Sequence, residues 1–448
     1  MSKKKETVDE LLEEVLLPED GQTHEVPENW VWVKSEFVAK WGSGGTPSRK
    51  NSEYYNGNIP WLKTGELRDT VILDSEEKIT EEGLKKSSAK LFPKDSVAIA
   101  MYGATIGKLG ILGIDAATNQ ACAVGVPYAL TDKKFMFYYF LTQRKNLINR
   151  GKGGAQPNIS QTIIKEFPYI LPPINEQKRI VDKIEHLLNK IEEAKQLIEE
   201  AKETFELRRA AILEKAFSGE LLTSSFNKIT KKINEQITLE IPNHWEVKTL
   251  SDVVENYNNQ RIPVSQKKRE EMEGDIPYYG ATGIVDFVDG YTHEGEFVCI
   301  GEDGANLLSR SKPQAFIIIG KSWVNNHAHV VKMNDNMCNN YLMHYINFIP
   351  LNDYVTGTAQ PKLNRKNLDK IPIVLPPVNE QFSISQKIED LLSKEIEMMN
   401  VCDSNLHGID IIKQSIMNKA FRGELGTNDP SEENTIELLK EVLQEQVK

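Results

Sequence analysis

Two stretches of the chain place apolar residues at alternating steps of four and three. The steps join Ile180, Ile184, Leu187, Ile191, Ala194, Ile198, Ala201, Phe205, Arg208 and Ile212 in the first stretch, and Ile384, Ile388, Leu391, Glu395, Met398, Cys402, Asn405, Ile409, Ile412 and Ile416 in the second. These are a and d positions of a heptad repeat, so the pattern predicts two long helices paired along one seam, interrupted by Arg208, Glu395 and Asn405. About 38 residues of helix would form a rod of about 57 Å. Two separate surface helices are the alternative.

The segments before each rod have a different pattern. Short apolar runs, such as Ser96–Tyr102, Phe297–Ile300 and Ala315–Ile319, are broken by Gly, Asn and Asp. Runs of this length between turn residues predict strands. Longer helical stretches at Lys133–Leu147 and Asn339–Asn347 indicate an α+β fold instead of a pure barrel.

The chain carries one unit twice. Residues 153–188 and 357–392 align without a gap at an offset of 204 and agree at 17 of 36 positions, including the Leu-Pro-Pro that precedes each rod. The register persists at the rod ends, where Lys215-Ala-Phe-x-Gly-Glu-Leu221 matches Lys419-Ala-Phe-x-Gly-Glu-Leu425. The unit starts match at an offset of 215, Trp30 against Trp245, so the intervening segments have diverged. So long a period indicates a duplicated domain, not a solenoid.

These patterns predict an α+β fold in which two globular recognition domains are joined by two long helices in an antiparallel coiled coil, as a pseudo-two-fold tandem repeat. We expect a dumbbell with a globular domain at each end of the coil. The expected boundaries are an N-terminal amphipathic helical segment at 1–25, domain 1 at 26–173, the first spacer helix at 174–221, a linker at 222–240, domain 2 at 241–377, the second spacer helix at 378–425 and an acidic helical tail at 426–448.

Composition suggests a reduced, cytoplasmic protein. No run of about 18 apolar residues could span a bilayer, and the N-terminus lacks the apolar core of a signal peptide. The four cysteines are scattered without metal-ligand spacing, which disfavours disulfides and a zinc site. The two ends resemble each other as short acidic amphipathic helices, at 7–16 and 435–443. We expect them to dock on partner subunits or on each other, with disordered tails as the alternative.

The net charge of −11 argues at first against nucleic-acid binding. The two ends carry much of this acidity, with −5 over 1–26 and −4 over 426–448, whereas 27–157 is +5. Residues 242–361 are acidic at −6, so binding there would need a local basic edge. Duplex DNA has a local two-fold axis, and a chain with the same pseudo-symmetry can place two modules on two half-sites. Because the segments between the matched ends of the two units have diverged, we expect the two half-sites to differ. The target would then be asymmetric and bipartite, with an unread spacer whose length is set by the coiled coil.

The local sequences carry a family resemblance. In the first unit they are Gly44-Gly-Thr-Pro-Ser48, Asn58-Ile-Pro-Trp-Leu-Lys-Thr-Gly-Glu-Leu67 and Asn119-Gln-Ala-Cys122, and in the second Tyr279-Gly-Ala-Thr-Gly283, Ile300-Gly-Glu-Asp-Gly-Ala-Asn306 and Trp323-Val-Asn-Asn-His-Ala-His329. With the Leu-Pro-Pro-x-Asn-Glu-Gln entry and the rod exits, this order resembles the specificity subunit of Type I restriction-modification systems, over about residues 26–425.

The resemblance implies a non-catalytic subunit that recognises double-stranded DNA for partner subunits. The partners would be two adenine methyltransferase subunits that use S-adenosylmethionine and, in the full complex, two motor-nuclease subunits that use ATP and Mg; a methylation-only complex is the alternative. No cofactor or metal is expected in this chain. Gly103–Lys108 has three residues between its glycines and Leu109 after the lysine, unlike a Walker A loop, and no methyltransferase Asn/Asp-Pro-Pro-Tyr/Phe motif occurs. A fused restriction-modification enzyme and a non-DNA coiled-coil scaffold remain competing hypotheses.

Candidate DNA contacts are side chains that can bind base edges or phosphates. In the first unit these are Lys63, Thr64, Tyr102, Thr105, Lys108, Asn119, Gln120, Lys152 and Gln156, with Arg49, Lys50 and Arg150 as further phosphate candidates. In the second they are Tyr279, Thr282, Glu302, Asp303, Asn306, Arg310, Asn325, Asn326, His327, Gln360, Lys362, Arg365 and Lys366. Glu302 and Asp303 would accept from cytosine amino groups, or orient their loop. For Asn119 and Gln120 the alternative is a turn cap, and for the basic residues a solvated surface.

Overall fold

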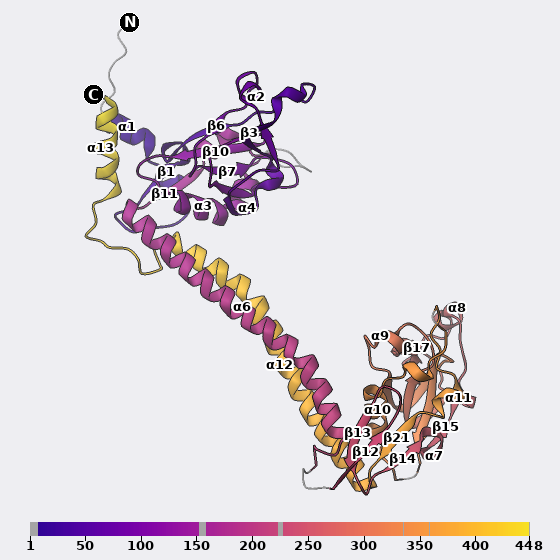
Figure 1. Cartoon of the computed structure of the whole chain (residues 1–448). Coiled ribbons are helices and arrows are strands. Elements are labelled where there is room, and N and C mark those ends of the chain that lie inside the picture. The colour runs from indigo at the N-terminus through magenta and orange to yellow at the C-terminus, as the bar shows by residue number, and fades with distance from the viewer. Residues whose placement is uncertain (1–7, 152–157, 223–226, 335, 358, 448) are drawn as a thin grey trace. The chain divides into compact units, whose positions relative to one another are not determined.

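The computed structural model describes residues 8–151, 158–222, 227–334, 336–357 and 359–447. The chain forms two compact units (Figure 1). Unit 1 comprises residues 1–196 and 405–448, and unit 2 comprises 197–404. Each unit therefore combines one globular domain with parts of both long helices, α6 (Ile174–Phe217) and α12 (Val378–Ala420).

The domain of unit 1 is built on three small sheets. The five-stranded sheet has the order β2 (Ala39–Ser43), β10 (Cys122–Pro127), β7 (Val97–Ala100), β8 (Leu109–Leu112) and β4 (Thr70–Ile72). The four-stranded sheet has the order β5 (Glu77–Ile79), β3 (Tyr55–Leu62), β9 (Ala116–Thr118) and β6 (Leu91–Phe92), and β1 (Val31–Lys34) pairs with β11 (Pro168–Leu171). The helices are α1 (Val8–Val15), α2 (Glu81–Lys85), α3 (Lys133–Thr142), α4 (Arg144–Asn149) and α5 (Gln161–Lys165).

The domain of unit 2 repeats this plan with its main strands in one sheet. The order is β15 (Val254–Asn256), β20 (Ala328–Met333), β18 (His293–Gly301), β19 (Ala315–Val324), β16 (Ile276–Gly280) and β17 (Gly283–Val288). Here β14 (Glu246–Thr249) pairs with β21 (Pro372–Leu375), as β1 does with β11. The helices are α7 (Leu250–Val253), α8 (Gln266–Glu270), α9 (Asn306–Ser309), α10 (Asn339–Phe348) and α11 (Arg365–Leu368).

Each domain is closed by the helix end that belongs to the other sequence copy. In unit 1 the exit of α12 places Phe421 against Phe135 and Tyr139. In unit 2 the exit of α6 places Phe217 against Tyr341 and Tyr345. The glycines that follow, Gly423 and Gly219, have φ of +75° and +78°. A Cβ there would come within 2.4 Å of Pro27 and 2.6 Å of Pro242. The repeated exit motif therefore docks on the repeated domain entry.

The two long helices lie side by side, and the order of their contacts is antiparallel in both units (Figure 1). In unit 1, Ile180 and Ile184 share a core with Met417 and Ala420, and Glu192 pairs with Lys413 at 3.4 Å. In unit 2 the cross-helix ion pairs are Lys202–Asp403 at 2.5 Å and Arg208–Glu395 at 3.8 Å. Two of the polar seam positions predicted from the sequence therefore face one another across the helices.

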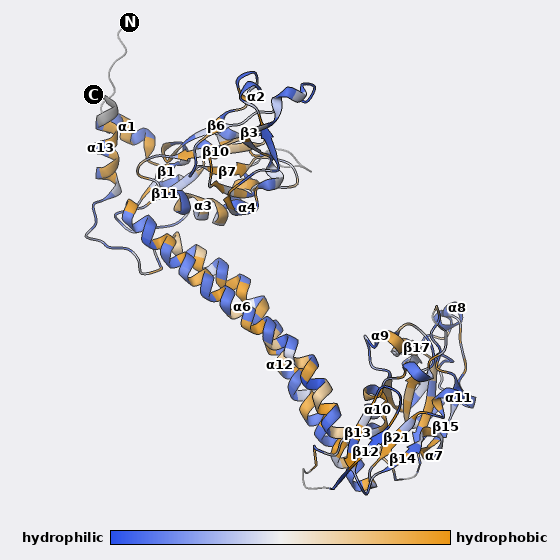
Figure 2. Ribbon diagram, viewed as in Figure 1, coloured by the Kyte–Doolittle hydropathy of each residue, from blue (hydrophilic) through white to orange (hydrophobic). Residues whose placement is uncertain are grey.

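The predicted seam of the second helix is wrong at three positions. Met398 and Ile412 are 48% and 51% exposed, and Asn405 is exposed too, whereas Met399, Leu406 and Lys413 are partly buried. In the first helix, Ala194 and Arg208 are likewise exposed. In the second helix the other predicted heptad position, which includes Ile388, Cys402 and Ile409, is at least partly buried, so the seven-residue repeat persists and the second position lies one residue later than predicted. Apolar colour accordingly alternates with polar colour along both helices (Figure 2).

The segments outside the domains are also structured. The expected linker contains β12 (Lys228–Lys232), which pairs with β13 (Thr238–Pro242) in a hairpin. The terminal helices α1 and α13 (Thr435–Val447) pack together in unit 1, where Val15, Leu439 and Leu443 are buried in its core. Of the alternatives for the two ends, docking on each other is the one found. Among the described residues, no helix has the length and apolar character needed to traverse a bilayer.

Candidate DNA interface

Three loops of unit 1 meet where strands of its two larger sheets end. They follow β3, β7 and β9, and carry the candidates Lys63 and Thr64, Tyr102 and Thr105, and Asn119 and Gln120 respectively. The Asn119 amide donates to the Leu62 carbonyl at 2.9 Å, and the Met101 amide to the Ala121 carbonyl at 2.8 Å. Backbone hydrogen bonds therefore hold the three loops together at one edge of the sheets.

Unit 2 builds the same three-loop arrangement after β16, β18 and β19. The Asn325 amide donates to the Tyr279 carbonyl at 3.1 Å, and the Glu302 amide to the His327 carbonyl at 2.8 Å. The bonds pair each loop with its counterpart: Asn119 occupies the place of Asn325, and Tyr102 the place of Asp303. Gly103 and Gly304, next in each loop, have φ of +85° and +103°. The two domains thus share a backbone plan and differ in the side chains that it presents.

The third loop of each unit carries two adjacent amide side chains, and the two have different roles. In both units the first one caps the turn, because the Asn119 Oδ1 accepts from the Ala121 amide at 3.1 Å and the Asn325 Oδ1 from the His327 amide at 2.8 Å. The next residue, Gln120 or Asn326, is exposed. The turn-capping alternative therefore applies to Asn119 and Asn325, and the amides available to a base edge are those of Gln120 and Asn326.

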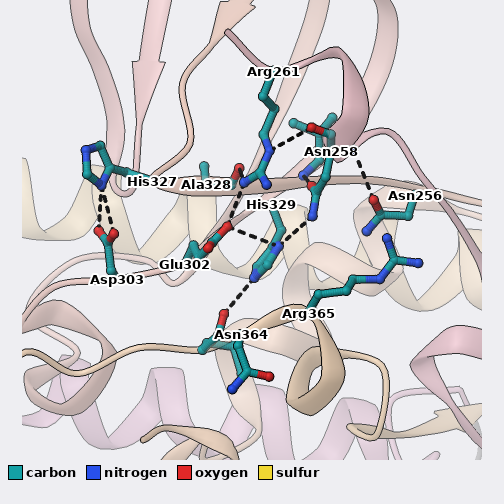
Figure 3. A network of polar contacts seen from close by, with 12 residues as sticks. Asn256, Asn258, Arg261, Glu302, Asp303, His327, Ala328, His329, Asn364 and Arg365 are labelled. Atoms are coloured by element: carbon teal, nitrogen blue, oxygen red, sulfur yellow. Dashed lines mark hydrogen bonds and ion pairs between the residues drawn. The ribbon is translucent and has the colours of Figure 1, made fainter. Parts of the chain in front are cut away.

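Six of the candidates in unit 2 line one open cleft of about 650 Å³. They are Thr282, Asp303, Asn306, Asn325, Asn326 and His327. The His327 ring nitrogen Nδ1 lies 2.8 Å from the Asp303 carboxylate (Figure 3). Amide, hydroxyl, imidazole and carboxylate groups together offer both donors and acceptors, as readout of base edges in the major groove requires.

Glu302 belongs to a buried network beneath the cleft. Its carboxylate, 12% exposed, accepts from Arg261 at 2.6 Å and lies 3.5 Å from the His329 ring (Figure 3). The Lys362 ammonium lies 3.3 Å from the same carboxylate. Burial alone would raise the pKa of this carboxyl, but the hydrogen bond from Arg261 and the charges of His329 and Arg261 lower it. Of the two roles predicted for Glu302, orienting its loop fits this network, and Asp303 is the acid that reaches the cleft.

The neighbouring His329 is buried and bonded at both ring nitrogens. Its Nε2 lies 2.7 Å from the Leu363 carbonyl and its Nδ1 2.8 Å from the Asn258 side-chain amide. Burial lowers the pKa of His329. Sequence reasoning missed Asn258 and Arg261, since only the fold brings residues 258–261 under the loop at 302. Within the described residues no group of three or more His, Cys, Asp and Glu side chains could hold a metal ion.

Other candidates lie away from the cleft or are already paired. Lys63 bonds Glu77 at 3.1 Å, Lys108 pairs with Asp69 at 3.0 Å and Arg365 with Asp369 at 2.8 Å. The Arg310 guanidinium donates to the backbone carbonyls of Ile349 at 2.8 Å and Asn347.

The remaining candidates divide into three groups. Tyr279 stacks on Phe316 with ring centroids 5.6 Å apart. Gln360 and Lys366 are exposed, and Thr64, Tyr102 and Thr105 are partly exposed. Lys152 and Gln156 lie outside the described residues.

Two domains of one plan, each with a three-loop polar edge and joined by long helices, define a tandem recognition protein. The chain matches the family model described as Type I restriction modification DNA specificity domain over residues 27–203 and 242–402, and belongs to that family. Both matched regions are described as DNA specificity domains, one in each half of the chain. This confirms the family that the local sequences were found to resemble, and the fold class predicted from the repeat.

Curated relatives are similar over different extents. The specificity subunit of the Type I restriction enzyme MjaIX from Methanocaldococcus jannaschii is 23% identical over 421 residues, covering 89% of this chain and 94% of that one. A putative type I restriction enzyme specificity subunit from Haemophilus influenzae is 43% identical over 149 residues, 33% of this chain and 37% of that protein. The EcoR124I/EcoR124II specificity subunit of Escherichia coli is 31% identical over 160 residues, 34% of this chain and 40% of that protein. The chain thus spans less than half the length of these last two relatives.

A solved structure shares the fold. The crystal structure of the HsdS subunit from Thermoanaerobacter tengcongensis superposes with a TM-score of 0.65 at 17% identity, covering 90% of this chain and 99% of that one. A chain from a structural study of the assembly and conformational transition of the type I restriction-modification system gives a TM-score of 0.64, also at 17% identity.

Proposed function

We propose that this subunit reads an asymmetric bipartite DNA target, with one half-site for each domain and an unread spacer set by the paired helices. The observation that carries the proposal is the matched pair of three-loop edges. The backbone hydrogen bonds that hold the loops together correspond, yet Tyr102 stands where unit 2 has Asp303, and Gln120 where unit 2 has Asn326. Identical frames with different donors and acceptors select different bases.

The subunit then directs the chemistry of its partners. In this proposal two methyltransferase subunits modify adenines in the target, and two motor-nuclease subunits join them for restriction. Assembly with partner subunits in general is supported by the structural neighbour that comes from a study of type I complex assembly. The base-contact residues named for the two clefts are part of this proposal.

The experiment is a methylome of cells that express the chain with its modification subunits. We expect one motif with two different half-sites and a fixed gap. A matched culture carries Asn326→Ala together with Asp303→Ala, which should degrade only one half-site. An ungapped motif, or no sequence-specific methylation with an assembled complex, would contradict the proposal.

A further inference from the structure

One segment of the two diverged domains has kept its register. Residues 45–62 align without a gap on 262–279 and agree at six positions, which are Ser48 and Ser265, Lys50 and Lys267, Glu53 and Glu270, Gly57 and Gly274, Ile59 and Ile276, and Pro60 and Pro277. We name residues 45–54 and 262–271 the arms. Each arm leads into β3 or β16, the strand before the first of the three loops of its unit, which we call the reading loops.

The two arms are attached to their sheets in the same way. The Gly45 amide donates to the Thr118 carbonyl at 2.9 Å, and the Ile262 amide to the Val324 carbonyl at 3.3 Å. The carbonyls of the same two residues accept from tryptophan side chains, Trp61 at 2.9 Å and Trp323 at 2.8 Å. The sequence correspondence of the arms is therefore also a spatial one.

An arginine fastens each arm to the edge of the sheet. Arg49 lies 5.1 Å from the Trp61 ring centroid and pairs with Glu77 at 2.5 Å. Arg269 lies 4.8 Å from the Tyr278 ring centroid and pairs with Asp286 at 2.8 Å.

The two arginine contacts, which we name the clasps, occupy equivalent places in the two sheets. Trp61 is the strand partner of Glu77, and Tyr278 is the partner of Asp286. The arginines do not align in sequence, yet they stack on the same position of the sheet. Stacking on an aromatic ring and pairing with a carboxylate both restrict the arm.

The arms lie beside the reading loops. In unit 1 the Thr46 hydroxyl bonds the Gln120 side-chain amide oxygen at 2.5 Å. In unit 2 the arm residues Pro263, Val264, Ser265 and Arg269 line the same cleft as Asn326 and His327. Part of each arm therefore lies next to the groups proposed to read bases.

Lys50 and Lys267 are the basic side chains that the two arms share. Both are exposed, and within the described parts of the chain neither has an ion pair, whereas Lys63, Lys108, Lys362 and Arg365 all do. Domains that read different bases still meet the same phosphate backbone. Both domains keep a lysine at the same place, although the side chains of the neighbouring loops have changed. A contact to the phosphate backbone, which is the same at every sequence, explains this.

We infer that Lys50 and Lys267 are the phosphate contacts common to both domains, held in place by the arginine-fastened arms. The inference rests on the proposed function for its DNA and adds sequence-independent contacts that act alike at both half-sites. Each lysine that neutralises one phosphate contributes about 0.9 to the slope of log binding constant against log salt concentration.

The test uses the complex with its modification subunits and the double variant Lys50→Ala/Lys267→Ala. Binding to the target duplex and to a random duplex is measured over a series of salt concentrations. We expect both affinities to fall by the same factor, the salt slope to decrease by about 2, and each single variant to account for about half of that decrease. Thermal melts establish that the variants fold.

The matched control is Lys40→Ala/Lys332→Ala. These lysines are also exposed, but they lie toward the ends of β2 and β20 remote from the reading loops, with Val126 and Glu255 as strand partners. An unchanged slope in the arm variant, or a slope change no larger than in the control, would overturn the inference while leaving the proposed function intact. Loss of discrimination between target and random duplex would also overturn it, because the lysines would then read bases. A wild-type complex that prefers no gapped sequence would overturn the proposed function, and the slope on random duplex would still decide the inference.

Discussion

At the scale of single residues, the exposed side-chain amides of Gln120 and Asn326 are the clearest candidates for contact with bases. Replacing Asn326 by Ala removes a donor and acceptor from the cleft without touching the cap formed by Asn325. A bidentate amide–adenine contact is worth about 1–3 kcal/mol of discrimination, so we expect preference at one position of one half-site to fall by roughly 5- to 150-fold. Binding to a library of variant targets measures this loss.

The matched variant in unit 1 is Gln120→Ala, which should affect only the other half-site. Asn325→Ala serves as the structural comparison, because it breaks the turn and should lower stability and reading together. If Asn326→Ala left every target position equally well discriminated, the assignment of the third loop to base readout would be wrong.

A second residue-scale expectation concerns acid stability. His344, buried on α10, has its pKa lowered to about 4 by burial, with the charge of Arg209 adding to the effect. Burial also lowers the pKa of His293 and His329 in the same unit. The unfolded chain binds these protons below about pH 6.5, whereas the folded unit resists them. The stability from His344 is therefore full above about pH 6.5 and is lost as pH falls toward 4, by about 3 kcal/mol.

Hydrogen exchange, corrected for its intrinsic pH dependence, should show unit 2 opening more readily at pH 5 than at pH 7. His344→Gln replaces the ring with a side chain that does not titrate, so it should flatten this dependence. An equal dependence in wild type and variant would show that His344 does not titrate in this window.

At the scale of elements, the terminal helix α13 stabilises unit 1. Leu443 is 8% exposed in the core beside a cavity of about 520 Å³, so Leu443→Ala should cost about 2 kcal/mol, the lower end for a buried leucine. Val442→Ala is the matched control, since Val442 is 37% exposed on the same helix and should cost little. Hydrogen exchange should report the loss in unit 1 alone. Loss in both units, or an equal loss in the control, would contradict this role.

Local sequence patterns predicted several strands and both long helices. The apolar runs at Val97–Ala100, within β18 and within β19 did predict strands, and the Leu-Pro-Pro motifs did mark the starts of α6 and α12. The seam was predicted correctly at one heptad position, which includes Ile388 and Ile409, and was wrong by one residue at the other, because Met398 and Met399 are both apolar and the spacing alone does not choose between them.

The side chains that reach the cleft were harder to predict from the sequence than the strands and helices. Candidates adjacent in sequence to turn signals, such as Asp303 and Asn326, do reach the cleft. Glu302, one residue away, does not, because Arg261 holds its carboxylate below the surface. That contact joins residues 41 apart, and the clasp arginines Arg49 and Arg269 stand at unmatched positions of their arms. Side-chain direction at a loop depends on such long-range partners, which no local pattern contains.

At the scale of the whole molecule, the helices are the part expected to set the spacer. Both run without a break, α6 over 44 residues and α12 over 43, and pair Lys202 with Asp403 near their middle. Inserting 22 residues of matched helical sequence into both helices at this level adds six turns, or about 33 Å. This length is close to one turn of B-DNA, about 34 Å, so both domains would again meet the same face of the duplex.

We expect the methylated motif of this insertion variant to keep both half-sites and to gain a spacer about 10 base pairs longer. An insertion of 11 residues, about 16 Å, is the informative comparison. It nearly preserves the phase of the seam, because three turns of α-helix take about 11 residues, but half a DNA turn would place the second half-site on the opposite face. The shorter insertion should therefore bind one half-site at a time and methylate weakly. A variant that kept the original spacer after the longer insertion would show that the paired helices do not measure the gap, and that contacts between the domains and partner subunits set it instead.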